Sequence, residues 1–221
     1  MKIIKLILCC TVLVLSACSI TKPTDEVKQW RLMPTRSADV STTKANFWIT
    51  QGNISVVSPF DTKSWVFMVD DARFQKDFYN EYISIPGEMI TNATRQWLEQ
   101  SGIFQFVNTN NNNLFANYVL QGNVEELFVD IRKDPKVVIR INYLLTTNLD
   151  SNNPVLLRKT YTATEQISNR VDSKDILKAQ EIALSKILTQ LEEDLVEVGN
   201  NVTKNPIKKL NPSTMDKKSS K

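Results

Sequence analysis

The sequence predicts an α+β fold in which two α-helices pack on one face of a mostly antiparallel β-sheet. Residues 116–167 alternate apolar and polar side chains over long stretches, as strands with one covered face do. Residues 86–101 and 172–199 instead repeat their apolar side chains with the spacing of amphipathic helices. The chain has 221 residues, of which 42% are hydrophobic, and this is enough for one domain with a sizeable core.

The expected domain begins with two short strands. Phe47–Ile49 starts the ordered region, and residues 54–57 form a strand that Ser58-Pro59 interrupts. A second strand, ended by Asp70-Asp71, is indicated by the alternating residues Trp65, Phe67 and Val69.

The first helix is expected to begin at Pro86, a residue suited to the first helical position, and to end at Gly102. Its apolar stripe consists of Met89, Ile90, Ala93 and Trp97. A strand with Phe104, Phe106 and Val107 follows, and the asparagine-rich run 108–113 predicts a turn.

An antiparallel meander is expected next, with strands within residues 116–131, 137–145 and 155–167. In the first of these strands the apolar residues change parity at Glu125-Glu126 and nowhere else. We therefore expect a β-bulge or bend at these two residues.

The last helix is expected to be capped by Asp172 and to end at Gly199. Its apolar stripe consists of Ile176, Ala179, Ala183, Leu184, Ile187, Leu188, Leu191 and Leu195. The side expected to face solvent carries Lys178, Glu181, Glu192 and Glu193.

Residues 1–17 have the pattern of a signal peptide, with a basic start and an apolar stretch too short to span a bilayer. Leu15-Ser16-Ala17-Cys18 resembles the bacterial lipobox, whose cysteine is acylated and becomes the first residue of the mature protein. An ordinary signal peptide followed by a chance cysteine is the alternative. Lipidation also explains why Cys18 is the single cysteine left after the signal is removed. By the sorting convention for such lipoproteins, Ser19 favours the outer membrane over the inner one, with the domain on the periplasmic face.

Polar segments flank the expected domain, residues 46–199. Residues 18–45 are expected to be a tether, within which Trp30, Leu32 and Met33 are candidates for docking on the domain. Residues 200–221 are expected to be a disordered basic tail. Residues 18–199 carry 19 basic and 23 acidic side chains, a balance that lacks the basic face of a nucleic-acid-binding protein.

The residue inventory argues against an enzyme. The chain has no histidine, the usual general base and commonest metal ligand, and no glycine-rich phosphate loop. We therefore expect no catalytic residue, no cofactor and no metal, which disfavours a small periplasmic hydrolase. Four acidic residues could suggest a cation site: Asp70, Asp71, Asp77 and Glu81. Their spacing matches no EF-hand loop, so we expect a solvated acidic turn instead.

Three aromatic residues, Phe78, Tyr79 and Tyr82, are the candidate contact residues for a partner or a lipid. Exposed aromatic side chains of this kind mark interaction surfaces. The alternative is that all three pack beneath the first helix as part of the core.

The segment 77–90, together with Trp97-Leu98 and Ser101-Gly102-Ile103-Phe104, resembles the ABC-type transport auxiliary lipoprotein family, as does the run Ala179–Leu184. The likeness covers residues 46–197. It implies a non-catalytic lipoprotein that accompanies an ABC permease, an ATPase and an MCE-domain protein, and assists phospholipid transport between the inner and outer membranes. The family contributes no residue-level site beyond the acylated cysteine. The alternative is a structural lipoprotein that supports an outer-membrane assembly such as lipopolysaccharide export.

Overall fold

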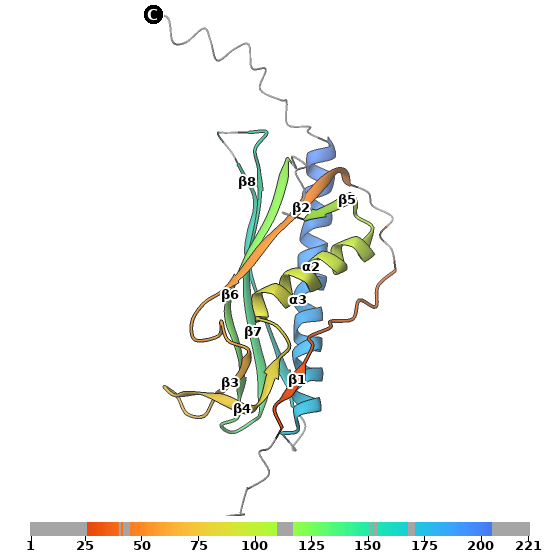
Figure 1. The fold of residues 1–221 in the computed structure, drawn as a ribbon. Helices are drawn as coiled ribbons and strands as arrows, with labels where there is room; N and C mark the ends of the chain where they lie inside the picture. The colour runs from red at the N-terminus through yellow and green to blue at the C-terminus, as the bar shows by residue number, and fades with distance from the viewer. Residues whose placement is uncertain are drawn as a thin grey trace, which may run out of the picture.

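The computed structural model describes residues 26–39, 41, 45–109, 117–150, 152, 154–167 and 171–204. Two helices, α2 (Pro86–Ser101) and α3 (Ser173–Lys204), accompany one eight-stranded sheet (Figure 1). Its strands are β1 (Lys28–Trp30), β2 (Ala45–Val56), β3 (Ser64–Met68), β4 (Phe74–Tyr82), β5 (Phe104–Thr109), β6 (Tyr118–Asp130), β7 (Lys136–Thr147) and β8 (Val155–Gln166). The α+β class is confirmed, and no helix of this described part is long and apolar enough to cross a membrane.

The sheet has two kinds of pairing. β6, β7 and β8 form the expected antiparallel meander, and β3 pairs antiparallel with β4. The remaining pairs are parallel: β1–β4, β2–β5, β2–β6 and β3–β6. The parallel pairs need long crossover connections. The chain supplies one between β2 and β5, because β3, β4 and α2 intervene.

The bulge expected at Glu125-Glu126 is confirmed. The register between β6 and β7 shifts between Val124, opposite Ile141, and Glu126, opposite Arg140. Leu120 and Val124 before the shift, and Leu127 and Val129 after it, are all buried. The extra residue lets both halves of the strand direct their apolar side chains into the core despite their opposite parity.

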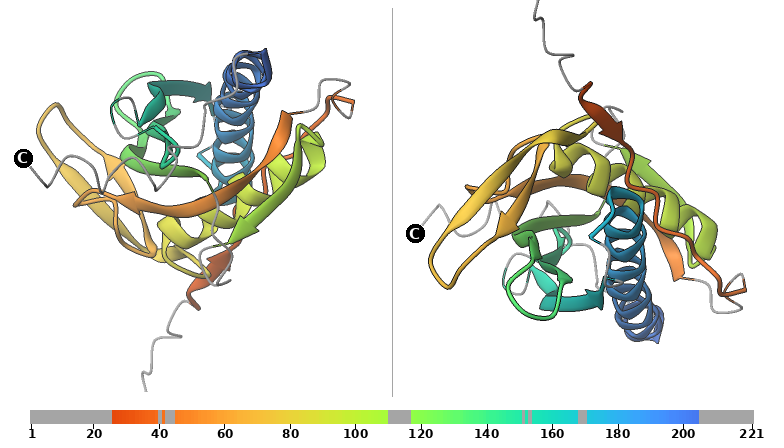
Figure 2. Two further views of the ribbon diagram at one scale, coloured as in Figure 1. Left: turned by 90° about the horizontal axis from the view of Figure 1, so that it is seen from above. Right: turned by 90° about the horizontal axis from the view of Figure 1, so that it is seen from below.

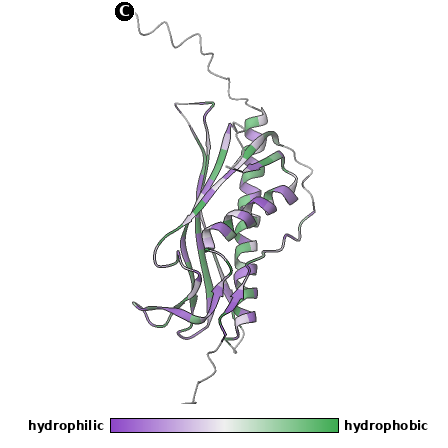
Figure 3. Ribbon diagram, viewed as in Figure 1, coloured by the Kyte–Doolittle hydropathy of each residue, from purple (hydrophilic) through white to green (hydrophobic). Residues whose placement is uncertain are grey.

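Both helices cover the same face of the sheet. The Thr94 hydroxyl of α2 is hydrogen-bonded to the Tyr143 hydroxyl of β7 at 2.9 Å. The Tyr161 hydroxyl of β8 donates to Asp194 of α3 at 2.5 Å, and the rings of Tyr143 and Tyr161 lie 6.0 Å apart, edge to face. Figure 3 shows the mixed polar and apolar character of both helices, which bury one side each.

The first helix has the predicted bounds. Pro86 occupies the start of α2, and Gly102 follows its last turn in the left-handed conformation, with φ of 64°. Glycine adopts this conformation at low cost, which explains why the helix ends there. The expected stripe residues, Met89, Ile90, Ala93 and Trp97, are all buried.

The last helix is longer than the sequence indicated. Its eight predicted stripe residues, from Ile176 to Leu195, are all buried, but α3 continues through Gly199 to Lys204. The prediction that Gly199 ends the helix is wrong. A Cβ atom at Gly199 would lie 3.0 Å from the Cβ of Ala45, so this glycine lets β2 approach the helix closely. Residues 200–204, assigned to the tail, are helical, and residues 205–221 lie outside the described residues.

Candidate functional site

The three candidate contact residues have different surroundings in the structure. Tyr82 is buried and its ring lies 6.1 Å from that of Trp65, so for this residue the core interpretation is correct. Its hydroxyl is hydrogen-bonded to Gln180 of α3, and burial raises the pKa of that hydroxyl well above its usual value. Phe78 and Tyr79 are 75% and 52% exposed, so for these two residues the core interpretation is wrong.

Phe78 and Tyr79 occupy an irregularity in β4 that we call the β4 bulge, residues 77–80. Ser64 of β3 is opposite Glu81 and Val66 is opposite Lys76, so residues 77–80 have no counterpart on β3. The Asp77 carboxylate accepts hydrogen bonds from the backbone N–H groups of Tyr79 and Asn80, at 2.8 and 3.2 Å. The side-chain amide of Asn80 also donates to Asp77, at 2.8 Å. These bonds hold the two aromatic residues at an outward turn.

A second exposed aromatic pair lies on the ladder between β2 and β5. Trp48 and Phe106 are directly opposite each other, with ring centroids 5.7 Å apart, and they are 46% and 43% exposed. The sequence pattern predicts a strand at Phe106 and the start of the ordered region at Trp48, and it indicates no contact role for either residue. Adjacent strand residues face opposite sides of a sheet, so the aromatic neighbours Phe47 and Trp48 indicate that one of them points away from the core.

Residues 31–39 form a strap between α2 and α3. Leu32 is buried, as expected for a docking residue, whereas the Met33 side chain is exposed. The backbone N–H of Met33 donates to the Glu181 carboxylate at 3.1 Å, and that of Thr35 donates to the Ser185 hydroxyl at 3.2 Å. Viewed from below in Figure 2, the strap runs along α3 on the side of α2.

The strap changes two earlier assignments. Residues 26–39, expected to be part of a tether, instead add β1 to the sheet beside β4 and then pack on α3. Residues 18–25 of that tether lie outside the described residues. Glu181 and Glu192, expected on the solvated side of the helix, face the strap and accept its hydrogen bonds.

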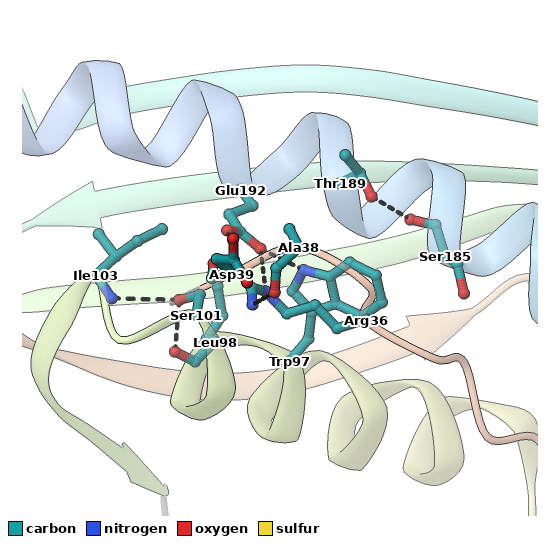
Figure 4. A network of polar contacts seen from close by, with 10 residues as sticks. All are labelled: Arg36, Ala38, Asp39, Trp97, Leu98, Ser101, Ile103, Ser185, Thr189 and Glu192. Atoms are coloured by element: carbon teal, nitrogen blue, oxygen red, sulfur yellow. Dashed lines mark hydrogen bonds and ion pairs between the residues drawn. The ribbon is translucent and has the colours of Figure 1, made fainter. Parts of the chain in front are cut away.

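Glu192 connects the strap to both helices (Figure 4). Its carboxylate accepts two hydrogen bonds from the Arg36 guanidinium, at 2.6 and 2.9 Å, and one from the Trp97 indole N–H at 2.7 Å. The Arg36 and Glu192 side chains are 5% and 13% exposed. The hydrogen bond to Glu192 raises the pKa of Arg36 above its usual value, so the guanidinium stays charged.

A groove of about 580 Å³ lies between β2 and the N-terminal part of α2. Much of its lining is polar and includes Gln51, Asn53, Asp61, Glu88, Thr91 and Arg95. Arg95 is also paired with Glu99 at 2.6 Å. A lipid acyl chain needs a continuous apolar wall, so this groove does not suit one.

The acidic residues before and within β4 are bonded to protein groups. Asp70 accepts from Arg73 at 2.9 Å, and Asp71 pairs with Arg132. Glu81 accepts from the Gln29 amide at 2.7 Å, and Asp77 holds the β4 bulge. Within the described ranges, no group of three or more acidic, cysteine or histidine side chains is placed to hold a metal ion. Cys18, the predicted lipidation site, lies outside those ranges.

Comparisons with known proteins show the fold. No family model matches the sequence, and no curated protein matches it. Protein XCC0632 from Xanthomonas campestris, of family DUF330, superposes with a TM-score of 0.68 at 18% identity, over 78% of this chain and 98% of that one. An uncharacterized protein superposes with a TM-score of 0.59 at 10% identity, over 77% and 99% of the two chains.

A minor lipoprotein from Acinetobacter baumannii reaches a TM-score of 0.36 at 12% identity, over 68% of this chain and 92% of that one, which is too low to carry an argument. The two stronger matches establish a fold shared along almost the whole length of each relative. The chain is therefore similar in fold to the DUF330 protein XCC0632.

Proposed function

We propose that this protein is a lipid-anchored lipoprotein on the periplasmic face of the cell envelope, with the outer membrane favoured. It works by binding, without turnover, as an auxiliary component of an MCE-type ABC transporter that moves phospholipid between the inner and outer membranes. Its partners in this proposal are the MCE-domain protein and the permease and ATPase of that transporter.

The observation that carries a binding role is the exposed pair Trp48 and Phe106. Large aromatic side chains are enriched in protein interfaces, and they contribute most where they lie close together in a well-packed patch. Here the Trp48 ring of β2 and the Phe106 ring of β5 lie edge to face at the surface. β5 forms one edge of the sheet. We assign this surface to the partner protein.

Two further observations support the envelope and transporter parts of the proposal. The sequence Leu15–Cys18 resembles a lipobox, and the segment from Asp77 to Phe104 resembles the auxiliary lipoproteins of MCE-type transporters. The lack of histidine and of any cysteine after Cys18 supports a protein without acid–base or thiol chemistry of its own.

Lipidation is tested at the mature N-terminus. Mass spectrometry is expected to find an acylated Cys18 as the first residue, and Cys18→Ser is expected to release the protein from the membrane fraction. More than one acyl chain gives stable anchoring, because each buried CH₂ contributes about 0.8 kcal/mol. An unmodified N-terminus at another residue, or full membrane retention of Cys18→Ser, would contradict the anchor.

The partner is tested by purification in mild detergent through a tag at the C-terminus, with detection of the MCE-domain protein. The Trp48→Ser/Phe106→Ser variant is expected to recover much less of that protein than the native chain does. The matched control is Phe78→Ser/Tyr79→Ser, which changes a more exposed aromatic pair on another strand. Recovery of an unrelated outer-membrane assembly in place of the MCE-domain protein would favour the structural-lipoprotein alternative.

A further inference from the structure

We propose that the β4 bulge is a membrane-docking surface, which inserts Phe78 and Tyr79 into the interfacial region of the bilayer that holds the lipid anchor. The proposal rests on the anchoring at Cys18 put forward above. It adds a second, non-covalent contact between this domain and phospholipid, made by side chains and separate from the surface assigned to the protein partner.

The bulge has the chemistry of an interfacial contact. Phe78 is the most exposed of the large hydrophobic residues in the described part of the chain, and Tyr79 beside it carries a polar hydroxyl at the end of an apolar ring. Aromatic side chains with this character concentrate at the boundary between lipid and water. The three hydrogen bonds to Asp77 hold the turn in place, so presenting the two rings requires little ordering on docking.

The surface extends to Val27, the residue just before β1. Lys28 is opposite Asn80 in the parallel ladder, and this register places Val27 next to Tyr79. Val27 is itself 46% exposed, so an exposed aliphatic residue lies beside Tyr79 in the continued register. The segment that precedes β1 therefore contributes to the docking surface and leads back along the chain toward Cys18.

The length of chain before β1 keeps this surface near the bilayer. Eight residues lie between Cys18 and Val27. The nine Cα-to-Cα steps of a fully extended chain of that length span about 30 Å at most. A sphere of that radius around an acylated cysteine includes the headgroup layer, so the chain is short enough to keep Val27 within reach of it. Because the anchor tethers the domain to the bilayer, the effective concentration of lipid at the bulge is high. The lipid surface is therefore the partner we assign to the bulge.

The rest of the domain extends away from β1 and the β4 bulge. The strap contacts Glu181 of α3, whereas Ala45 at the start of β2 contacts Gly199 of the same helix. These two helix positions are about 27 Å apart along the axis, at 1.5 Å per residue. β1 and β4 lie at the bottom of Figure 1, and the end of α3 lies at the top. Trp48 and Phe106, on the β2–β5 ladder near Ala45, are therefore a control pair farther from the bilayer.

Exposed charges of both signs surround the bulge. Lys28 and Lys76 are exposed on the two strands, and Glu26 is exposed at the start of the described chain. Lysine side chains beside apolar ones suit a phospholipid surface, because their stems lie along apolar groups while the ammonium reaches phosphate. The mixed charge means that the aromatic residues, and not net charge, carry the docking.

The experiment tethers the domain without relying on acylation. Residues 19–221 contain neither cysteine nor histidine, so a hexahistidine tag in place of Cys18 binds nickel-chelating lipid at one point, and an introduced cysteine is the single labelling site. Vesicles contain phosphatidylethanolamine and phosphatidylglycerol with a small fraction of the chelating lipid. An environment-sensitive NBD fluorophore is attached at Val27→Cys or, as the control, at Phe106→Cys.

On tethering, the label at residue 27 is expected to shift its emission to shorter wavelength and gain intensity, while the label at residue 106 stays unchanged. The shift at residue 27 is expected to be lost in the Phe78→Ser/Tyr79→Ser background, whose folding is checked by circular dichroism. Should that double variant not fold, Tyr79→Ser alone serves, with a reduced shift expected.

Two results would overturn the docking surface. One is equal behaviour of the two labels, whether both shift or neither does. The other is a shift at residue 27 that persists without the aromatic side chains. Because the tag replaces the acyl group, these outcomes are independent of whether the cell acylates Cys18, which the mass of the mature N-terminus decides separately.

Discussion

Replacing Glu192 by alanine is expected to lower the free energy of unfolding by about 3–5 kcal/mol, the loss typical of removing one partner of a buried ion pair. The Arg36 side chain is only 5% exposed, so its charge would remain buried without its carboxylate. The Trp97 indole N–H would lose its acceptor as well. Chemical denaturation of the variant and the native chain, followed by circular dichroism, measures the difference.

Two matched variants separate this network from a general effect on α3. Glu193→Ala changes the exposed neighbour and is expected to alter the free energy of unfolding by less than about 0.5 kcal/mol. Glu192→Gln keeps an oxygen acceptor without the charge. Its loss in the free energy of unfolding is expected to lie between those of Glu193→Ala and Glu192→Ala. Equal stability of Glu192→Ala and Glu193→Ala would show that the strap contributes little to holding α2 and α3 together.

Truncating Ile187 to alanine is expected to cost about 2–5 kcal/mol, because the lost apolar contacts leave a cavity that the surroundings fill only partly. Ile187 lies with Leu184 and Leu191 on the side of α3 that covers the sheet, and all three are fully buried. The same denaturation experiment measures the cost, with Glu193→Ala as the surface control. A loss in the free energy of unfolding no larger than that of the control would mean that the stability of α3 does not depend on these buried contacts.

The sequence indicates the environment of Ile187 but not that of Glu192. Ile187 belongs to a stripe that repeats at helical spacing, so its burial follows from residues three and four positions away. Glu192 lies among charged neighbours in the sequence and has the pattern of a solvated residue. Its partner Arg36 is 156 positions away, and no local pattern contains that information.

The same division holds for the site residues. Sequence spacing grouped Phe78, Tyr79 and Tyr82, but Asp77 turns the first two outward, whereas Tyr82 continues the ladder beside Trp30 and enters the core. Strand β4 itself was not predicted, because the bulge breaks the alternation on which strand prediction depends.

The sequence by itself determined the helix that begins at Pro86, the meander, the bulge at Glu125-Glu126 and the apolar stripe of the last helix, since each depends on the order of nearby residues. The tertiary structure decided the parallel pairing of β1, β2 and β5, the strap between the helices and the role of Gly199 against Ala45. These features depend on which segments meet after the chain has folded. The sequence around Gly199 does not distinguish a glycine that ends a helix from one that gives room to a neighbouring strand, because Ala45 approaches it only in the folded chain.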